Sequence, residues 1–372
     1  MTFVMHLVIN GSDLARQRGG NESYLRGLLG GLATVVAPSA VRVSLVVTRE
    51  GARLQEAEPG WLRFHVVNVG PYRRFPFLLW QQTAILRRLR PNWLVSTFFL
   101  PPLTPCHAAV LIHDLSFRAH PEYFPRSMAG YMRLFTGLAV RRADRIIALS
   151  QFTQRELLRF YPAAQGKIVT IYPGVGAEFT PDGNLGADDA LLATLGIQRP
   201  YLLAVGNIHP RKNLDRLLDA WEQLRTAGLP VPTMVWAGLG RWESSVLLDR
   251  ARAAGVQLLG FVEPADLPAL YRRAEALAYP SLYEGFGLPP LEAMACGTPA
   301  LVPNTTSLPE AVGTAAVTVD PTDVGSLAEG LTRILFDREL RHNLRMRGFA
   351  QASGFRWERA AAQLLEALEN TV

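Results

Sequence analysis

The chain has 372 residues and a mass of 41.0 kDa, a length that suits two domains of ordinary size. With 49% hydrophobic and 19% charged residues it can bury a sizeable core, which excludes a disordered chain. No stretch approaches about 18 consecutive apolar residues, so a spanning helix is not expected. Two cysteines, Cys106 and Cys296, exclude a disulfide framework and indicate a reducing, cytoplasmic compartment.

Charge is unevenly distributed along the chain. Up to residue 178 there are 21 Lys and Arg against 10 Asp and Glu, a net charge of +11, whereas the remainder has 17 against 22. A basic half indicates an anionic partner, such as membrane headgroups, nucleic acid or a phosphorylated substrate. The alternative is a general preference for arginine without a special partner, because 36 of the 38 basic residues are arginine.

In chain order, short β-branched runs alternate with longer helical patterns, which predicts a parallel sheet built from βα units. The N-terminus lacks a basic region and a cleavage site, so it is expected to be a strand rather than a signal peptide. The first series of strands is predicted at 4–9, 41–47, 93–97, 109–112, 145–148 and 168–171. After the turn-rich segment 174–186 the series restarts, at 201–205, 233–237, 256–259, 276–279 and 298–302.

This restart predicts two α/β domains, at residues 1–178 and 179–354. A last helix within 355–372 follows a break at Ser353-Gly354 and could pack on either domain. Open parallel sheets bind ligands at the carboxyl ends of their strands. We therefore expect two doubly wound domains that face each other across a cleft, with the active site between them.

The most informative segment runs from Pro280 to Pro299. Glu284 sits just past a predicted strand, in a Glu-Gly-Phe-Gly loop that opens a helix expected near Pro289. The glycines allow close backbone approach, and free N–H groups at the helix start can hold a phosphate or a sugar hydroxyl. Glu292 is expected in the first helical turn, so two carboxylates would accept hydrogen bonds from one ligand's hydroxyls. A capping loop with a surface glutamate is the alternative.

Two cations, Arg211 and Lys212, follow the strand predicted at 201–205 and precede a helix beginning near Asn213. Cations at a helix N-terminus form a diphosphate site through fixed charge and helix dipole together. Lys212 and Lys167 are the only two lysines in a chain that otherwise uses arginine. A lysine at position 212 indicates a site where a compact ammonium group meets a leaving phosphate as a point charge. Solvated cations at a helix start are the alternative.

Four segments of the chain, taken together with their order along the sequence, resemble the retaining GT-B glycosyltransferases of family 4, also called glycosyltransferase group 1. Glu284 and Glu292, separated by seven residues, resemble the family's E-x7-E motif. The segment from Gly206 to Leu214 resembles its donor diphosphate site. The segments that begin at His113 and Ala143 resemble the strand ends of its N-terminal domain. The resemblance covers nearly the whole chain and leans towards bacterial mannosyltransferase-like members.

The resemblance implies an α/β fold of the GT-B type, with two Rossmann-like domains facing across a cleft. The N-terminal domain would bind the acceptor, and the C-terminal domain would bind the nucleotide-sugar donor. The implied reaction moves a hexose with retention, with mannose from GDP-mannose as the expected donor and no metal or other cofactor. No side chain suggests a covalent nucleophile, so the acceptor hydroxyl is expected to attack from the leaving-group face.

Site residues are carried over from the same resemblance. Glu292 would bind the ribose, Arg211 and Lys212 the diphosphate, and Glu284 the sugar hydroxyls. Further donor contacts are expected from Gly19, Gly20, Asn207, Phe261, Val262, Gly285, Phe286, Gly287 and Leu288. The family often has Gly-Arg where this chain has Gly206-Asn207, so one diphosphate contact is expected to be missing or supplied by Arg211. For Gly19 and Gly20, a plain loop pair is the alternative.

His113 ends a buried strand, and the resemblance places it beside the anomeric carbon, where it would orient the transferred sugar. It completes the expected catalytic set of His113, Glu284, Arg211 and Lys212. A structural histidine is the alternative. A metal site formed by His113, Asp114 and His120 is a competing idea that the resemblance disfavours.

The segment Tyr72–Arg90 mixes aromatic side chains with five arginines. Basic amphipathic stretches with Trp and Phe bind anionic interfaces, which predicts peripheral contact with the inner face of the cytoplasmic membrane. A core helix with a solvated basic side explains the pattern equally well. No nucleic-acid-binding motif accompanies the charge, so no nucleic-acid partner is expected. A glycan or lipid-linked acceptor of bacterial surface polysaccharide fits the basic half.

Several functions stay open beside this one. A transferase of the same fold that uses a UDP-sugar differs only in its donor. A sugar-nucleotide-binding protein without turnover is disfavoured by the intact set of Glu284, Glu292, Arg211, Lys212 and His113. An epimerase would consume the donor without an acceptor, and a phosphorylase would need a pyridoxal-phosphate lysine, for which only Lys167 is spare.

Overall fold

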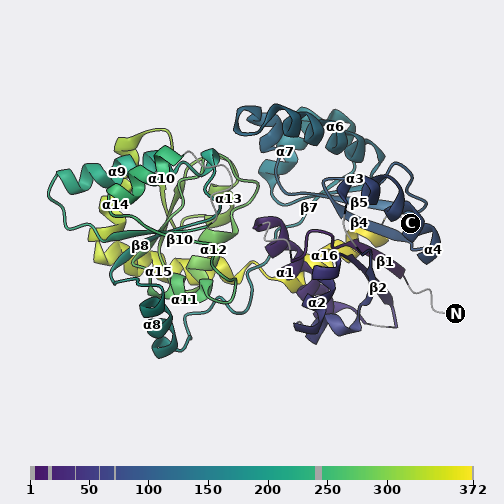
Figure 1. The fold of residues 1–372 in the computed structure, drawn as a ribbon, viewed down its shortest axis with the longest axis horizontal. Coiled ribbons are helices and arrows are strands. Elements are labelled where there is room, and N and C mark those ends of the chain that lie inside the picture. The colour runs from purple at the N-terminus through teal and green to yellow at the C-terminus, as the bar shows by residue number, and fades with distance from the viewer. Residues whose placement is uncertain are drawn as a thin grey trace. The chain divides into compact units, whose positions relative to one another are not determined.

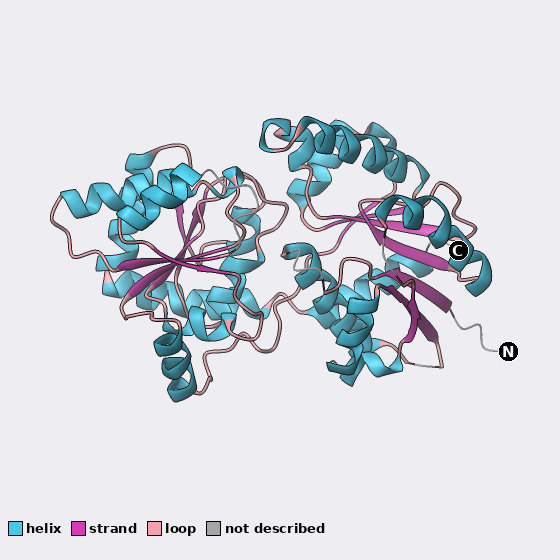
Figure 2. Ribbon diagram, viewed as in Figure 1, coloured by secondary structure: helices cyan, strands magenta, loops and turns pink. Residues whose placement is uncertain are grey.

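A computed structural model shows two α/β units, each a parallel sheet with helices on both faces (Figures 1 and 2). The structure describes residues 5–15, 19–37, 39–57, 59–70, 73–238 and 245–370. The first unit extends to Gly174 and includes the chain from Arg356 onwards, and the second unit is Val175–Phe355. The chain passes between the units at 174/175 and 355/356, close to the boundaries at 178/179 and 354/355 predicted from the sequence.

The first unit holds a seven-stranded sheet in the order β3-β2-β1-β4-β5-β6-β7, with every neighbouring pair parallel. Its strands are β1 (Met5–Asn10), β2 (Val41–Val47), β3 (His65–Asn68), β4 (Trp93–Thr97), β5 (His107–Ile112), β6 (Arg145–Ala148) and β7 (Ile168–Thr170). The α-helices are α1 (Gly20–Val35), α2 (Arg49–Ala57), α3 (Arg74–Pro76), α4 (Gln82–Leu89), α5 (Ser116–Ala119), α6 (Arg126–Arg142), α7 (Gln151–Phe160) and α16 (Trp357–Glu369). A π-helical turn, η2 (Phe77–Gln81), joins α3 to α4, and short 3-10 turns are η1 (Pro59–Arg63), η3 (Pro121–Tyr123) and η4 (Pro162–Ala164).

The second unit holds a six-stranded parallel sheet in the order β10-β9-β8-β11-β12-β13. Its strands are β8 (Tyr201–Val205), β9 (Thr233–Ala237), β10 (Gln257–Gly260), β11 (Ala276–Ala278), β12 (Ala300–Pro303) and β13 (Val317–Val319). The helices are α8 (Leu185–Thr194), α9 (Leu214–Thr226), α10 (Ser245–Ala253), α11 (Leu267–Arg273), α12 (Leu288–Ala295), α13 (Leu308–Val312), α14 (Val324–Phe336) and α15 (Arg338–Ser353), with a 3-10 turn, η5, at Pro210–Lys212.

Burial on both faces explains why the central strands are almost continuously apolar. Helices cover both sides of a parallel sheet, so successive side chains of a strand all point into the core. In β5 every residue after His107 is buried, and in β8 the first four residues are buried. The two doubly wound sheets confirm the predicted fold class.

The C-terminal helix α16 packs on α1 of the first unit. Gly31 makes this packing possible, because a Cβ at this position would lie 2.2 Å from the carbonyl oxygen of Trp357. The Trp357 ring also lies against the Tyr24 ring, edge to face, with centroids 5.2 Å apart. The sequence left open which domain this helix covers, and the structure assigns it to the first unit.

Two strands, β3 and β13, were not expected from the sequence. Both are short edge strands of three or four residues, too short for a periodic pattern to identify. Val4, which the sequence places at the start of the first strand, lies outside the described residues together with residues 1–3. None of the helices that the structure describes combines the length and the apolar character needed to cross a membrane.

Candidate active site

The expected donor residues of the second unit gather at the carboxyl ends of its parallel strands. Arg211 and Lys212 follow β8, Phe261 follows β10, and Glu284 follows β11. Because parallel strands end at one edge of the sheet, residues far apart in sequence meet there.

Three charged side chains form the centre of this site. The Arg211 Nη1 atom lies 2.7 Å from Glu284 Oε2, and the Lys212 Nζ atom lies 2.6 Å from Glu284 Oε1. Glu284 is 7% exposed and Lys212 is also buried, so the charges interact in a poorly screened environment. The two cations expected to bind a diphosphate therefore share the carboxylate expected to bind the sugar.

This arrangement lowers the pKa of Glu284. Burial of the carboxyl group alone would raise the pKa, but the positive charges of Arg211 and Lys212 outweigh burial and bring it down to about 2. Glu284 is therefore ionised throughout the neutral range, as an acceptor of hydroxyl hydrogen bonds needs to be.

A local turn holds the two cations in place. Arg211 and Lys212 lie on the 3-10 turn η5, directly before α9, which begins at Leu214 close to the start that the sequence predicts. Asn213 follows in the left-handed conformation, with φ of 59°, and separates η5 from α9. Its side chain donates hydrogen bonds to the carbonyl oxygens of Pro280 and Pro321, at 3.1 and 2.6 Å. Asn213 thereby ties the cation turn to the segment that carries Glu284.

Tyr279, which the sequence did not single out, connects Lys212 with Glu284. The Lys212 ammonium donates a hydrogen bond to the Tyr279 hydroxyl, which in turn donates to Glu284 Oε1 at 3.0 Å. The ammonium also lies 4.3 Å from the centre of the Tyr279 ring. Tyr279 ends the strand predicted at 276–279, directly before the Pro-Ser-Leu-Tyr-Glu run, and only the fold shows its hydroxyl inside the charged cluster.

The loop from Glu284 to Gly287 is held by a second unexpected residue, Ser307. Its buried hydroxyl lies within hydrogen-bond distance of two carbonyl oxygens, 2.8 Å from that of Glu284 and 3.0 Å from that of Phe286. Gly287 has a φ of 103°, a conformation that favours glycine, and a Cβ there would lie 2.6 Å from Leu308. Gly285 and Phe286 are buried, and Leu288 begins α12.

Glu292 has a different environment from the one expected. The helix α12 begins at Leu288, close to the start predicted near Pro289, and Glu292 is its fifth residue, beyond the first turn in which the sequence placed it. The Tyr271 hydroxyl donates a hydrogen bond to its Oε2 atom at 2.9 Å. Burial raises the pKa of Glu292 to about 7, against the lowering effect of this hydrogen bond. Glu292 therefore changes its charge near neutrality, whereas Glu284 does not.

The remaining expected donor residues of the second unit lie at the same strand ends. Asn207 is partly buried and follows Gly206, whose backbone passes close to the Lys212 side chain. A Cβ on Gly206 would lie 3.2 Å from Lys212 Cε. Phe261 is exposed and Val262 is partly buried, directly after β10.

In the first unit, His113 follows β5 and is buried between aromatic rings. Its ring centre lies 4.8 Å from that of Tyr24 and 5.6 Å from that of Phe98. Burial lowers the pKa of His113 to about 4, although the charge of Asp114 raises it, so the imidazole is neutral at pH 7. Its buried Nε2 atom has no hydrogen-bond partner among the described residues.

Gly19 and Gly20 lie at the start of α1, the helix that carries Tyr24. Gly19 caps the helix with a φ of 62°, and a Cβ on Gly20 would meet nothing within 4 Å. The structure thus leaves open space at Gly20, while Arg18 of the same segment lies outside the described residues. Within the described ranges, no three His, Cys, Asp or Glu side chains form a group suited to a metal ion, and this includes the competing trio of His113, Asp114 and His120.

Family models match both halves of the chain. The model described as Glycosyl transferases group 1 matches residues 193–351, and Glycosyltransferase Family 4 matches residues 18–179. The first match spans the charged cluster of Arg211, Lys212 and Glu284, and the second spans His113.

Curated relatives include mannosyltransferases. The chain is 34% identical over 309 residues to O-antigen chain mannosyltransferase B of Escherichia coli, covering 79% of this chain and 81% of that protein. It is 33% identical over 232 residues to the serotype-specific mannosyltransferase WbdA of Escherichia coli, which is 60% of this chain and 28% of WbdA. A D-inositol 3-phosphate glycosyltransferase of Salinispora arenicola is 36% identical over 245 residues, 61% of this chain and 55% of that protein.

Solved structures share the fold along the whole chain. Alr3699/HepE of Anabaena, determined in complex with UDP and glucose, has a TM-score of 0.77 at 19% identity, covering 98% of this chain and all of that one. WaaG, a glycosyltransferase involved in lipopolysaccharide biosynthesis, has a TM-score of 0.72 at 15% identity, covering 98% and 99%. Together these matches confirm the resemblance found in the sequence: the chain belongs to the group 1 glycosyltransferases of family 4 and has the GT-B fold.

Proposed function

We propose that this glycosyltransferase transfers mannose, with retention of configuration, from GDP-mannose to a glycan or lipid-linked acceptor in the synthesis of a bacterial surface polysaccharide. The observation that carries the proposal is the buried cluster of Arg211, Lys212 and Glu284 at the carboxyl ends of the second sheet. The names of the Escherichia coli relatives, O-antigen chain mannosyltransferase B and WbdA, support mannose as the sugar and a polysaccharide as the product.

The cluster provides the charges that the reaction needs. When the bond from the sugar to the nucleotide breaks, negative charge develops on the diphosphate, and Arg211 and Lys212 stabilise that charge. Glu284, ionised and held by the same two cations, accepts hydrogen bonds from the sugar hydroxyls. The acceptor hydroxyl attacks from the leaving-group face, and its proton passes to the departing phosphate. Fixed cations take the role of a metal ion in this proposal.

We further propose a role for His113 of the first unit in binding the transferred sugar. As a neutral imidazole whose Nε2 atom lacks a partner among the described residues, it can exchange a hydrogen bond with a sugar hydroxyl. We assign it the orientation of the transferred sugar, and Glu292 the ribose.

An exposed surface of the first unit supports peripheral contact with the cytoplasmic membrane. It consists of the exposed aromatic residues and arginines of the predicted segment Tyr72–Arg90, which are Phe75, Trp80, Arg73, Arg87, Arg88 and Arg90. Trp80 is 68% exposed and Phe75 54%, and the Phe75 ring packs edge to face on Tyr131 of α6, 5.5 Å between centroids. Aromatic side chains beside arginines suit an anionic interface and would place the enzyme next to a lipid-linked acceptor. Tyr72, at the start of the predicted segment, lies outside the described residues.

The alternatives differ in the donor or in turnover. A UDP-sugar donor would keep the charged cluster and change only the contacts to the base. A protein that binds a sugar nucleotide without turnover would keep nucleotide affinity and transfer nothing.

The first experiment is a thermal shift of the purified chain with GDP, UDP, ADP and CDP, with and without EDTA. A nucleotide at about 100 times its dissociation constant adds about 2.7 kcal/mol to the free energy of unfolding. A shift with GDP alone, unchanged by EDTA, supports the proposal, and transfer from GDP-mannose with NMR of the new anomeric centre then tests retention. A shift with UDP alone replaces the donor, a shift abolished by EDTA contradicts the metal-free mechanism, and no shift favours a protein without a donor site.

A further inference from the structure

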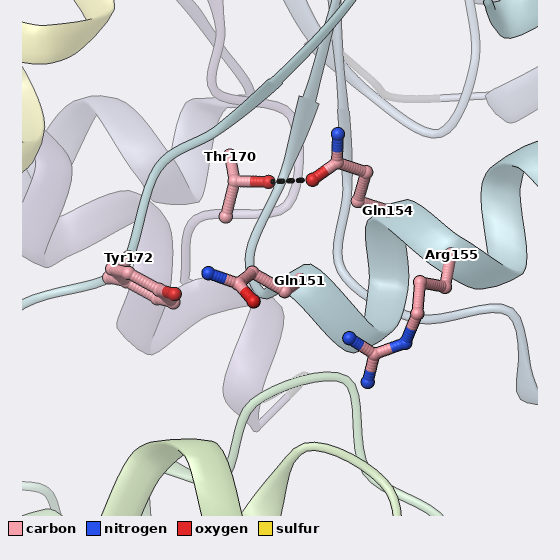
Figure 3. A pocket seen from close by; sticks show the side chains of 5 residues that line it. All are labelled: Gln151, Gln154, Arg155, Thr170 and Tyr172. Atoms are coloured by element: carbon pink, nitrogen blue, oxygen red, sulfur yellow. Dashed lines mark hydrogen bonds between the residues drawn. The ribbon is translucent and has the colours of Figure 1, made fainter.

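A surface recess in the first unit has no role in the site described above (Figure 3). Its volume is about 330 Å³, at the small end of the range for small-molecule pockets. Five side chains line it: Gln151, Gln154 and Arg155 from the start of α7, and Thr170 and Tyr172 from the end of β7 and just beyond.

The local structure directs these side chains to one place. In α7 the three lining residues stand at positions i, i+3 and i+4, which share one face of a helix, while Thr153 and Leu157 are buried on another face. Thr170 and Tyr172 are two residues apart in extended chain and so point to the same side. Figure 3 shows the Gln151 carboxamide directed towards Tyr172.

The recess lies where a parallel sheet binds ligands. β7 ends at Thr170, and α7 follows the end of β6, so the lining residues come from the carboxyl ends of two neighbouring strands. Open α/β sheets place their ligands at these ends. The charged cluster of the second unit stands at the corresponding end of its own sheet.

The chemistry of the lining suits a sugar. Thr170 Oγ1 donates a hydrogen bond to Gln154 Oε1 at 2.9 Å, which joins the helix to the strand across the recess. Carboxamides donate and accept, a guanidinium donates, and a tyrosine ring offers a flat apolar face, the combination that binds hydroxyl groups around a pyranose ring.

Charge argues against other ligands. The recess contains no carboxylate, so neither a metal ion nor an amine finds a counter-charge there. Among the described residues, Arg155 has no acidic partner, whereas Arg159, one turn further along α7, pairs with Glu156 at 3.2 Å. Arg155 is therefore available to a ligand, and Arg159 is not.

We propose that this recess is an acceptor subsite that binds one pyranose ring of the acceptor glycan. The proposal rests on the proposed function, because a transferase that extends a glycan needs a second carbohydrate site in addition to its donor site. Arg155 and Gln151 donate to ring hydroxyls, and Tyr172 stacks on the apolar face of the sugar.

The test measures binding of an α-linked mannobiose to the full chain saturated with GDP, by NMR titration. The variants are Arg155→Gln, Tyr172→Ala and, as the matched control on the same helix, Arg159→Gln. We expect Arg155→Gln and Tyr172→Ala each to weaken mannobiose binding at least about tenfold, because each removes one to two hydrogen bonds or one stacking contact. Arg159→Gln and the wild type should bind alike, and all four proteins should bind GDP equally.

Equal mannobiose affinity of the three variants and the wild type would overturn the proposal. So would a wild-type protein that binds GDP but no mannobiose, or one that binds mannose 6-phosphate only, which would make the recess an anion site. A different result would contradict the proposed donor function. In that case the wild-type protein would not respond to GDP, but it would still bind mannobiose, and Arg155→Gln would still weaken that binding.

Discussion

Lys212 and Glu284 form a buried ion pair of 2.6 Å between segments 72 residues apart, and the Tyr279 hydroxyl bridges the same two groups. The pair neutralises part of the positive charge that a diphosphate would otherwise meet. A donor that brings two negative phosphates must therefore share these cations with Glu284. We therefore expect that removing a charge from this cluster reduces the transfer rate more than it reduces the stability of the fold.

Replacing Lys212 by alanine should reduce kcat for transfer by about 10²–10³, the usual loss when one donor to developing negative charge is removed. The protein should still fold, because Arg211 remains paired with Glu284. The measurement is the steady-state rate with the donor found by thermal shift, together with the melting temperature.

Lys167 provides the matched control, as the only other lysine of the chain. Its Nζ atom donates to the carbonyl oxygen of Arg141 in the first unit, whereas the charged cluster belongs to the second unit. Lys167→Ala should keep the transfer rate within about twofold, a change of under 0.5 kcal/mol in the barrier. If Lys212→Ala transferred as fast as Lys167→Ala, the proposed role of the cluster would be wrong.

Ser307→Ala should loosen the loop that carries Glu284. The hydroxyl contacts two loop carbonyl groups in a buried position, so its loss should cost about 1–3 kcal/mol of unfolding free energy and raise the donor KM. Ser353→Ala is the control, because that hydroxyl bonds to Ala350 in an exposed position and should change neither quantity. An unchanged donor KM in Ser307→Ala would show that the loop keeps its shape without this contact.

Much of this architecture could be predicted from the chain itself. Long, continuously apolar runs such as those of β5 and β8 identify buried parallel strands, and the Glu-Gly-Phe-Gly and Pro-Arg-Lys-Asn segments identify the loops at their ends. Tyr279, Tyr271 and Ser307 could not be identified in this way. Each looks like an ordinary core or loop residue, and its partner is fixed only when two distant strand ends meet.

The environment of Glu292 was equally hidden. Its spacing from Glu284 suggested two similar carboxylates, but spacing carries no information on burial. The structure buries Glu284 and partly buries Glu292, and it gives only Glu284 cationic partners, so their pKa values move in opposite directions. Acid–base behaviour depends on the three-dimensional surroundings, which a motif does not describe.

Two neighbouring glycines of α1 should respond oppositely to alanine. A Cβ on Gly31 would lie 2.2 Å from the Trp357 carbonyl oxygen, so Gly31→Ala must push α16 away and should destabilise the protein by about 1–3 kcal/mol. At Gly30 a Cβ would meet nothing within 4 Å, and Gly30→Ala should stabilise the helix by about 0.5–1 kcal/mol. Urea unfolding of both variants measures the difference. Destabilisation by Gly30→Ala, or none by Gly31→Ala, would contradict the close packing of α16 on α1.

The last prediction concerns the pH dependence of donor binding. Glu292 has its pKa raised to about 7, so it is mostly protonated at pH 6 and mostly ionised at pH 8. Only the ionised form accepts hydrogen bonds at both oxygens, so nucleotide affinity should rise with pH through about 7. For stability the sign is reversed: the folded state holds this proton more tightly than the unfolded state, so Glu292 contributes less stability as pH rises from about 4.5 to 7.

Variants of Tyr271 and Glu292 test whether the Glu292 carboxyl, and not another titrating group, causes the pH dependence of nucleotide binding. Glu292→Gln resembles the protonated form and should bind the nucleotide weakly at every pH, without the rise. In Tyr271→Phe the hydrogen bond that lowers the pKa of Glu292 is lost, so the rise should move to higher pH while affinity at pH 9 recovers. Nucleotide dissociation constants between pH 5.5 and 9 measure both effects. A rise that persists unchanged in Glu292→Gln would assign the titration to another residue, and an unshifted midpoint in Tyr271→Phe would show that the 2.9 Å contact does not control the Glu292 proton.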